Sequence, residues 1–405
     1  MNESMNVSLA IGGRFHAFDL AAQLQKRGFL RTLITSYPSF KVRDWQVQSS
    51  KVQSIVSHEV LSRGWRWLAR RPGLRGALRG QPQFGFNVRF DRMAARCIPD
   101  DTDIFVAWSS MALHGFKRAS QLGAKTILER NSTHIAFQRD ILAEEYELAG
   151  LTADLPDPRI VERELMEYEK ADYICVPSSF AYRSFVDSGV PRHKIFTAPF
   201  GVDAGQFRPV SQKRDDRFRM VHCGALTIRK GVHYLLQAFH ELNLPDAELW
   251  LIGPNSNEIE PYLKKYGNSN VFLKGTFPQA LLYEQYSQGS VFCLASVEEG
   301  FGMVISQAMA CSLPVVCTAN TTGEDIVRNG VDGFVIPIRD VNALKERLLF
   351  LYADRDRCRA MGASARKRIL DGFTWDHYGD SISKQYARIH GGLAPAPYLA
   401  AALTA

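Results

Sequence analysis

Short apolar runs alternate with amphipathic segments along almost the whole chain, and this alternation limits the possible folds more than any other feature. The stretches between the runs, such as residues 17–28 and 231–242, space their apolar residues as helices do. Strands that alternate with helices predict the α/β class, with parallel sheets covered by helices on both faces. The runs that we interpret as strands are residues 5–11, 30–36, 103–108, 125–130, 173–178, 219–225, 247–253, 270–275, 290–296, 313–319 and 333–337.

The strand and helix pattern starts twice, at Met5 and again near Phe218. The stretch between the two halves, residues 198–218, is polar and contains Gly and Pro, which is typical of a connector. A chain of 405 residues is also too long for one compact core. We therefore expect two Rossmann-like domains with a ligand-binding cleft between them. The expected parts are an N-terminal acceptor-binding domain (1–198), a C-terminal donor-binding domain (199–374), a helix crossing back to the first domain (375–390) and a mobile tail (391–405).

The charge balance and the cysteines indicate the surroundings in which the chain works. A formal net charge of +7 favours anionic partners such as phosphates or acidic lipid. The seven cysteines are scattered without a Cys-x-x-Cys pair, as expected for reduced thiols. Residues 1–15 lack the pattern of a signal peptide, and no apolar run has the length of a membrane span. We expect a cytoplasmic protein, with a peripheral position on the inner face of the membrane as a possibility.

The stretch from Ser296 to Val316 carries the strongest functional signal. Glu299 is followed by Gly300-Phe301-Gly302 and then by an apolar helix. Glycines let a ligand approach the backbone, and the free amides at a helix start suit a diphosphate. Gln307, one turn into the helix, is expected to lean back toward the same end. Taken alone, the glycine pair is better explained by an ordinary strand-to-helix turn.

Two more loops follow apolar runs in the same way. In residues 223–236 a strand leads to Gly224, then to the basic pair Arg229 and Lys230, and then to a helix. Two cations at the end of a strand beside a helix start are better explained by a phosphate ligand than by solvation alone. In the first half, Gly12, Gly13 and Arg14 form a similar loop, and we expect it to meet a phosphate from across the cleft.

In this order the segments resemble the retaining nucleotide-sugar glycosyltransferases of the GT-B fold, glycosyltransferase family 4. The resemblance spans roughly Val7 to Tyr386. Residues 298–316 look like the family's Glu-x7-Glu segment, and residues 224–231 look like its donor-phosphate loop. Residues 11–28 are similar to the family's first loop and helix, and residues 275–296 are similar to its segment that holds the nucleoside. Residues 198–209 are similar to its interdomain connector, with Phe200 in place of Asn.

The resemblance implies roles for particular residues. Glu299 would face the donor sugar, Lys230 would neutralise the donor diphosphate, and His134 would point into the cleft as the third catalytic residue. Without the family, a buried structural histidine is an equally good interpretation of His134. The full set of implied donor-binding residues is Gly224, Arg229, Lys230, Gly275, Thr276, Phe277, Glu299, Gly300, Phe301, Gly302 and Gln307. The implied acceptor and phosphate loop is Gly12, Gly13 and Arg14.

The chain departs from the family at two donor-site positions. Gln307 stands where the family usually has a second Glu, which accepts hydrogen bonds from the ribose. Ala225 stands where the family often has an Arg, and Arg229 is expected to supply the missing charge. Without the negative charge at 307, each hydrogen bond falls from roughly 1.5–3 to about 0.5–1.5 kcal/mol, which weakens donor binding without abolishing it.

We expect no metal site and no cofactor. Asp101-Thr102-Asp103 spells the Asp-x-Asp metal motif of the other large glycosyltransferase fold. It lies at the start of a strand, away from the expected cleft, and we interpret it as a solvated strand entry. Stabilisation of the leaving phosphate would then come from basic side chains and helix-start amides.

The most unusual part of the first domain is Ser57 to Gly80. Read as a helix to Arg70, it places Val60, Leu61, Gly64, Trp65 and Leu68 on one side, and Ser62, Arg63, Arg66 and Arg70 on the other. A basic amphipathic helix with tryptophans suits an anionic membrane surface. The alternative is a helix packed on its own domain with a solvated basic face. The expected membrane contacts are Trp65, Trp67, Arg63, Arg66 and Arg70, and no nucleic-acid-binding signature accompanies these arginines.

These expectations favour an enzyme that moves a sugar, with retention of configuration, from a nucleotide-diphosphate donor to a saccharide or lipid-linked acceptor, in the synthesis of a cell-surface polysaccharide or glycan. Two alternatives stay open. One is a catalytically degenerate binding or scaffold subunit, and the other is a sugar-nucleotide epimerase of the same fold.

Overall fold

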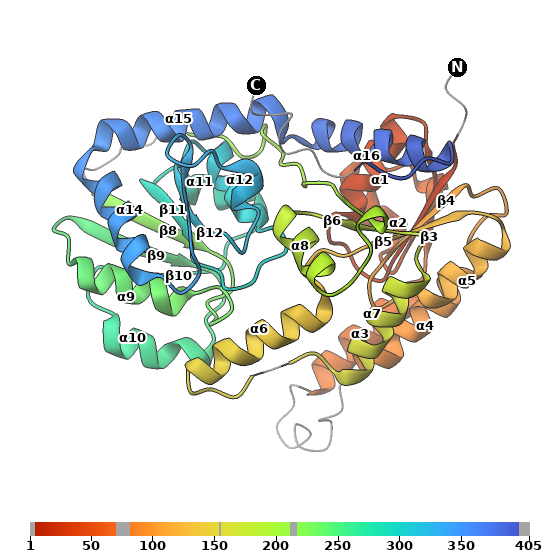
Figure 1. Cartoon of the computed structure of the whole chain (residues 1–405), viewed down its shortest axis with the longest axis horizontal. Coiled ribbons are helices and arrows are strands. Elements are labelled where there is room, and N and C mark those ends of the chain that lie inside the picture. The colour runs from red at the N-terminus through yellow and green to blue at the C-terminus, as the bar shows by residue number, and fades with distance from the viewer. Residues whose placement is uncertain (1–4, 70–81, 154, 211–216, 397–405) are drawn as a thin grey trace.

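A computed structural model describes residues 5–69, 82–153, 155–210 and 217–396. It contains two α/β lobes that lie side by side, the N-terminal lobe in red to yellow and the C-terminal lobe in green to blue (Figure 1). The predicted fold class is confirmed, because each lobe is built around one parallel sheet covered by helices.

The N-terminal sheet has seven strands in the order β3-β2-β1-β4-β5-β6-β7, and all paired neighbours run parallel. The short edge strands β3 and β7 were not among the predicted runs, because three residues give little periodicity to detect. The strands are β1 (Val7–Ile11), β2 (Leu30–Thr35), β3 (Val52–Ser54), β4 (Ile104–Trp108), β5 (Lys125–Glu129), β6 (Tyr173–Val176) and β7 (Ile195–Thr197).

The C-terminal sheet repeats this winding with six parallel strands in the order β10-β9-β8-β11-β12-β13. In both sheets the strand order reverses beside the first strand, between β1 and β4 and between β8 and β11. Ligands of such sheets bind outside the carboxyl ends of the strands at this reversal. The strands are β8 (Phe218–Cys223), β9 (Ala247–Ile252), β10 (Val271–Gly275), β11 (Val291–Leu294), β12 (Val315–Thr318) and β13 (Gly333–Ile336).

Helices cover the faces of both sheets, and central strands such as β1 and β4 are buried along their whole length. This explains why their sequences are continuously apolar and do not alternate. No helix in the described ranges is long and apolar enough to cross a membrane. The N-terminal helices are α1 (Ala17–Lys26), α2 (Ser39–Val42), α3 (Val56–Ala69), α4 (Gln83–Ala95), α5 (Leu113–Gln121), α6 (Ile135–Leu148), α7 (Pro158–Lys170) and α8 (Ser179–Asp187). The C-terminal helices are α9 (Val232–Leu242), α10 (Glu260–Tyr266), α11 (Leu282–Tyr286), α12 (Met303–Ala310), α13 (Gly323–Ile326), α14 (Val341–Ala353), α15 (Arg355–Gly372) and α16 (Trp375–His390).

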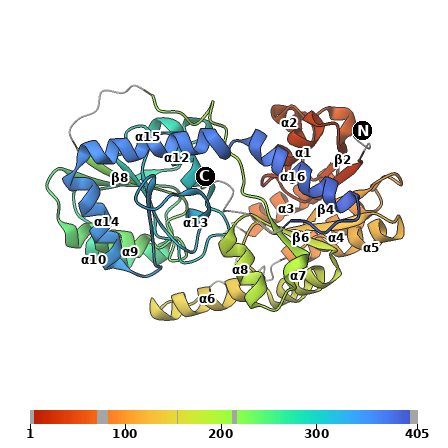
Figure 2. The same ribbon diagram turned by 45° about the horizontal axis from the view of Figure 1, so that its top comes forward.

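The chain passes between the lobes at two adjacent places. The Val202 amide donates to the carbonyl of Phe373, 2.9 Å away, so the outgoing and returning segments are bonded to each other. Gly201 lies against the backbone of Trp375, where a Cβ atom would come within 2.4 Å of the Trp375 nitrogen. After this crossing α16 runs over the N-terminal lobe beside α1 (Figure 2). Its Tyr378 and Tyr386 are buried in that lobe's core.

A second connection between the lobes is helix α6, which leaves the N-terminal lobe and reaches under the C-terminal lobe (Figure 1). Near its end, the carboxylate of Glu145 is 3.0 Å from His233 Nε2, 2.8 Å from the Tyr234 hydroxyl and 2.6 Å from Arg339 Nε. These bonds tie the two lobes together at a distance from the strand ends.

Candidate functional site

The glycine loop occupies the carboxyl end of β11, at the point where the C-terminal strand order reverses. Gly302 has φ = 79°, a left-handed conformation that favours glycine, and α12 begins at the next residue. The first amides of a helix have no partner within it and are available to a ligand. Gly300 lies against the other lobe, and a Cβ atom there would come within 2.1 Å of the Asn131 carbonyl oxygen. A strand-to-helix turn alone does not require glycine at this second position.

The basic pair from the β8 loop meets the two acids of the glycine loop. Lys230 forms an ion pair with Glu299. Arg229 Nη2 is 2.7 Å from the carboxylate of Glu298. The structure thus brings together Glu299, Arg229 and Lys230, which lie far apart in the sequence. Two cations and two carboxylates at the mouth of a strand–helix turn form a site where an anionic ligand can compete with the carboxylates for the cations.

Burial changes the charge behaviour of Lys230. Burial, followed by the neighbouring Arg229 guanidinium, lowers the pKa of Lys230 to about 8, while Glu298 acts in the opposite direction. A lysine with this pKa is still mostly cationic at neutral pH. Gly224 has φ = 147°, and a Cβ atom on it would lie 3.7 Å from His222 Nε2 and 4.0 Å from Lys230 Cε, so this glycine lies directly beside the Lys230 side chain.

A cavity of about 690 Å³ opens between the lobes beside these loops. Gln307 lines it, and its Oε1 atom accepts a hydrogen bond from the Tyr286 hydroxyl at 3.4 Å. From the opposite lobe Arg14 Nη2 donates to Gln279 Oε1 at 3.2 Å, so the predicted loop of the first domain does reach across the cleft. Its polar lining includes Arg14, His16, Asp19, Asp203, Gln279 and Gln307.

Three lining residues were missed by the sequence analysis. The ring of His16 stacks on Phe200 with centroids 4.1 Å apart, so Phe200, which departs from the resembled family, supports the floor of the cleft. Burial raises the pKa of Asp19 to about 6, while His16 and Arg14 oppose the rise. Asp203 faces Asp19 closely enough to raise its pKa further. His16 and Asp19 come directly after the first glycine loop, and Asp203 lies in the connector. These positions were the signal available in the sequence.

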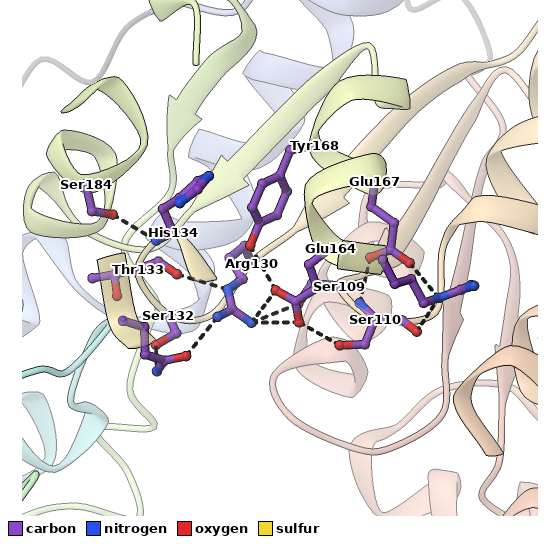
Figure 3. A network of polar contacts seen from close by, with 12 residues as sticks. Ser109, Ser110, Arg130, Ser132, Thr133, His134, Glu164, Glu167, Tyr168 and Ser184 are labelled. Carbon is purple, nitrogen blue, oxygen red and sulfur yellow. Dashed lines mark hydrogen bonds and ion pairs between the residues drawn. The ribbon is translucent and has the colours of Figure 1, made fainter. Parts of the chain in front are cut away.

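His134 does not reach this cleft, and the expected catalytic position for it is wrong. Its backbone amide donates to Ser184 Oγ at 2.9 Å (Figure 3). Its ring packs between Tyr168 and Phe185, with centroids 4.9 and 5.1 Å away. Burial, together with the Arg130 charge, lowers the pKa of His134 to about 4. The ring is therefore a neutral core group, as the alternative interpretation proposed.

The segment expected near the nucleoside base lies only partly at the cavity. Strand β10 ends at Gly275, which has φ = 70°. Gly275 and Thr276 are exposed and Phe277 packs against the apolar core, whereas Gln279 and Ala280 line the cavity.

The Asp-x-Asp sequence has structural partners. Asp101 pairs with Arg31 at 2.9 Å, and Asp103 accepts the Asn6 amide at 2.7 Å, at the amino end of β4. In the described part of the chain no group of three His, Cys, Asp or Glu side chains is arranged to hold a metal ion.

Helix α3 departs from the packed-helix alternative, because most of its apolar side faces solvent. Val60 is 62% exposed, Trp67 59% and Leu61 41%. The Arg63 guanidinium is exposed and pairs with Glu59 of the previous turn. Trp65 is half-buried. The side chain of Arg66 and all of Arg70 lie outside the described residues.

The first turn of α3 connects it to the cleft. His58 is buried, and its Nε2 atom would lie 3.2 Å from a Cβ atom on Gly12. The exposed apolar surface therefore begins directly behind the glycine loop of the first domain.

Comparison with known proteins identifies the family of the C-terminal domain. Residues 203–368 match the family model described as glycosyl transferases group 1. The capsular polysaccharide biosynthesis glycosyltransferase CapM of Staphylococcus aureus is 25% identical over 233 residues, which cover 53% of this chain and 61% of CapM. The GDP-mannose-dependent alpha-(1-6)-phosphatidylinositol monomannoside mannosyltransferase of Mycolicibacterium smegmatis is 28% identical over 236 residues, which cover 53% of this chain and 62% of that protein. The chain thus spans less than two thirds of the length of these curated relatives.

Solved structures match over nearly the whole chain and show its fold. Sucrose-phosphate synthase from Thermosynechococcus elongatus superposes with a TM-score of 0.70 at 18% identity, covering 96% of this chain and 100% of that one. HepE from Anabaena, solved in complex with UDP and glucose, superposes with a TM-score of 0.65 at 14% identity, covering 95% of this chain and 99% of that one. The two lobes form the GT-B fold.

Proposed function

Because its C-terminal domain belongs to the glycosyl transferases group 1 family, we propose that this chain transfers a sugar from a nucleotide-diphosphate donor to an acceptor hydroxyl. The observation that carries the proposal is the meeting of Arg229 and Lys230 with the glycine loop at the switch point of the C-terminal sheet. Cations beside helix-start amides match the charge of a diphosphate.

In the proposed reaction the bond between the anomeric carbon and the donor phosphate oxygen breaks, and a bond from that carbon to the acceptor oxygen forms. Negative charge grows on the leaving diphosphate, where Lys230, Arg229 and the amides of Phe301 and Gly302 stabilise it. The acceptor proton passes to the departing phosphate. Glu299, released from Lys230 by the donor, is then free to face the sugar.

Two finer features of the reaction are part of the proposal and have direct tests. The family resemblance favours retention of configuration, and anomeric NMR of the product would contradict it by showing inversion. The cationic side chains favour transfer without a metal ion, and loss of transfer in EDTA that Mg²⁺ restores would refute that. The nucleoside is proposed to occupy the cavity beside Gln307, between the two lobes.

The acceptor is proposed to be a saccharide or a lipid-linked saccharide that is presented at an anionic membrane surface. The support is helix α3, whose first turn places the buried His58 beside Gly12 and whose side chains of Val60, Leu61 and Trp67 are exposed. An exposed apolar stripe with a tryptophan and flanking arginines suits the membrane interface, on the inner face for a cytoplasmic protein. Failure to float with vesicles that contain anionic lipid would contradict this part of the proposal.

The first experiment is thermal stabilisation and calorimetry with a panel of nucleotide diphosphates and nucleotide sugars that includes both UDP and GDP forms. We expect one base to bind, and binding to be lost in Lys230→Ala. The matched control is Lys345→Ala, since Lys345 pairs with Glu241 at 2.5 Å in the same domain and neither residue lines the cavity between the lobes. Loss of binding in both variants, or in neither, would argue against a donor site at Lys230.

The same panel decides between the proposal and its alternatives. Absence of nucleotide binding, with anionic lipid present as well, would favour the scaffold subunit. Conversion of a donor to another sugar nucleotide without an acceptor would favour the epimerase. Gln307→Glu restores the charge that the resembled family has, and we expect it to tighten nucleotide binding by roughly tenfold if the ribose lies there.

A further inference from the structure

Glu298, the residue before the expected sugar-facing Glu299, is fully buried at the junction of the two lobes. One carboxylate oxygen accepts hydrogen bonds from the hydroxyls of Ser132 at 2.8 Å and Thr133 at 2.7 Å, both in the N-terminal domain. The other accepts from Gln138 Nε2 at 3.0 Å and pairs with Arg229 at 2.7 Å. A buried carboxylate is costly unless it is fully paired, so these contacts have to form together.

The contacts also keep Glu298 ionised. Burial would raise its pKa, but the Arg229 charge and the hydrogen bonds from Gln138, Thr133 and Ser132 hold the pKa below its usual value. Three of these four groups belong to the N-terminal domain. The charge of Glu298 is therefore satisfied only while the lobes are in contact.

Arg229 takes its orientation from Glu298. Its Nε atom donates to the Glu298 carbonyl at 3.2 Å, and its Nη2 atom lies against the Glu298 carboxylate. Within the described residues, Glu298 is the acceptor of every side-chain hydrogen bond of Arg229, whose side chain is 35% exposed. The remaining N–H groups of the guanidinium fork are left for a ligand.

The N-terminal groups that hold Glu298 are themselves fixed by a buried network (Figure 3). Arg130 Nε donates to the Thr133 carbonyl and Nη2 to Gln138 Oε1, each at 3.0 Å. Arg130 also pairs with the buried Glu164 at 2.9 Å, and Glu164 accepts the Tyr168 hydroxyl at 2.8 Å. Because Thr133 and Gln138 are anchored to their own domain, they present Glu298 with a fixed set of donors. The geometry of these contacts changes only when the lobes separate.

We propose that Glu298 is a positioning residue that makes phosphate binding by Arg229 depend on contact between the two lobes. This inference rests on the proposed donor site. When the lobes close, Ser132, Thr133 and Gln138 fix the Glu298 carboxylate, and the carboxylate aims Arg229 at the donor diphosphate. Coupling between two binding events is reciprocal, so a bound diphosphate in turn favours closure. The donor is thereby held tightly only in the closed state, which has both halves of the site.

The test is a double-mutant cycle between Thr133→Val and Arg229→Ala, read as the dissociation constant of the nucleoside diphosphate. Thr133→Val keeps the shape but removes a hydrogen bond to a charged group, and we expect binding to weaken about tenfold. In the Arg229→Ala background the same change should have no effect, since the residue through which it acts is gone. Thr133→Ser, which keeps the hydroxyl, should bind as the unmodified protein does.

Thr126→Val is the matched control, because it also removes a hydroxyl that donates to a carboxylate, that of Asp172 at 2.8 Å, but this pair lies inside the N-terminal domain and does not bridge the lobes. Its effect on affinity should be the same with and without Arg229. Melting temperatures without ligand separate folding defects from these effects. An equal Thr133→Val effect in both backgrounds, or no effect in either, would overturn the inference. If the unmodified protein bound no nucleoside diphosphate, the proposed function itself would fail, whereas Lys230-dependent binding without coupling would refute this inference alone.

Discussion

Placing an alanine at Gly300 should obstruct contact between the lobes while leaving each lobe folded. The new Cβ atom would lie 2.1 Å from the Asn131 carbonyl oxygen and 2.4 Å from Ser132 Cα. Both are backbone atoms of an anchored loop, so they cannot move aside as a flexible side chain would. The φ angle of Gly300 is not in the left-handed region, so alanine fits the local backbone and the collision falls on the interface.

The expected size of the effect follows from the overlap. Forcing a methyl group into a packed contact costs about 1–3 kcal/mol, and the hydrogen bond from Ser178 Oγ to the Gly300 carbonyl at 2.6 Å is strained at the same time. Since 1.4 kcal/mol is about a factor of ten, we expect the closed population to fall roughly 10- to 100-fold. Donor turnover should fall by a similar factor. Affinity for the nucleoside diphosphate should fall less, because Lys230 and the α12 amides belong to one lobe.

The assay combines turnover, calorimetry and small-angle scattering, where Gly300→Ala should have the larger radius of gyration with nucleotide bound. Gly85→Ala in α4 is the control, because no atom of the described residues lies within 4 Å of its added Cβ and its φ angle is ordinary. It should match the unmodified protein in every measurement. Normal turnover and normal scattering by Gly300→Ala would refute the view that this contact forms during the reaction.

Three further perturbations test other parts of the structure. Lys230 is cationic below its pKa of about 8, so the affinity for the diphosphate, measured by calorimetry, should fall as the pH rises through 8. Lys230→Arg should remove that fall, because arginine stays charged. The same pH dependence in both proteins would contradict the role of Lys230 in binding the diphosphate. Glu145→Gln should destabilise the protein by about 2–3 kcal/mol in denaturant titrations, whereas Glu144→Gln, which breaks only an exposed pair with Arg339, should change little. Trp67→Ser should reduce flotation with anionic vesicles, and the equally exposed Phe40→Ser outside α3 should not; equal losses would mean unspecific adsorption.

The fold and the donor loops could be predicted because both depend on local patterns. Apolar runs and helical spacing fix which segments are strands and helices, and parallel order then brings their carboxyl ends to one edge. That is why Gly224, Lys230 and Gly302 could be placed near one another before the structure was known. Each lies directly after a strand or at a helix start, and neither position needs tertiary information.

His134 and helix α3 could not be predicted, because their surroundings come from distant segments. His134 sits at the start of α6, where a side chain can turn toward the cleft or toward the core. The rings of Tyr168 and Phe185, in α7 and α8, decide for the core. For α3 the sequence shows an apolar side but not whether another element covers it. In the structure Val60 is 62% and Trp67 59% exposed, so that side faces solvent.

The adjacent residues Glu298 and Glu299 also have different surroundings that the sequence alone could not predict. The residue types of Glu298 and Glu299 are identical, and only the tertiary structure separates their partners. Glu298 meets hydroxyls of the other lobe and the Arg229 guanidinium, while Glu299 meets Lys230 at the open side of the loop.

Charge-neutral substitutions of the two carboxylates should therefore have different kinetic effects. Glu299→Gln should lower the rate of transfer, because it alters the group that faces the sugar, but it should not weaken nucleotide binding, because the ligand then no longer competes with the Glu299 carboxylate for Lys230. Glu298→Gln should lower nucleotide affinity and closure together, because it loosens both Arg229 and the contact between the lobes. If the two variants had the same kinetic defect, the division of roles between the two carboxylates would be wrong.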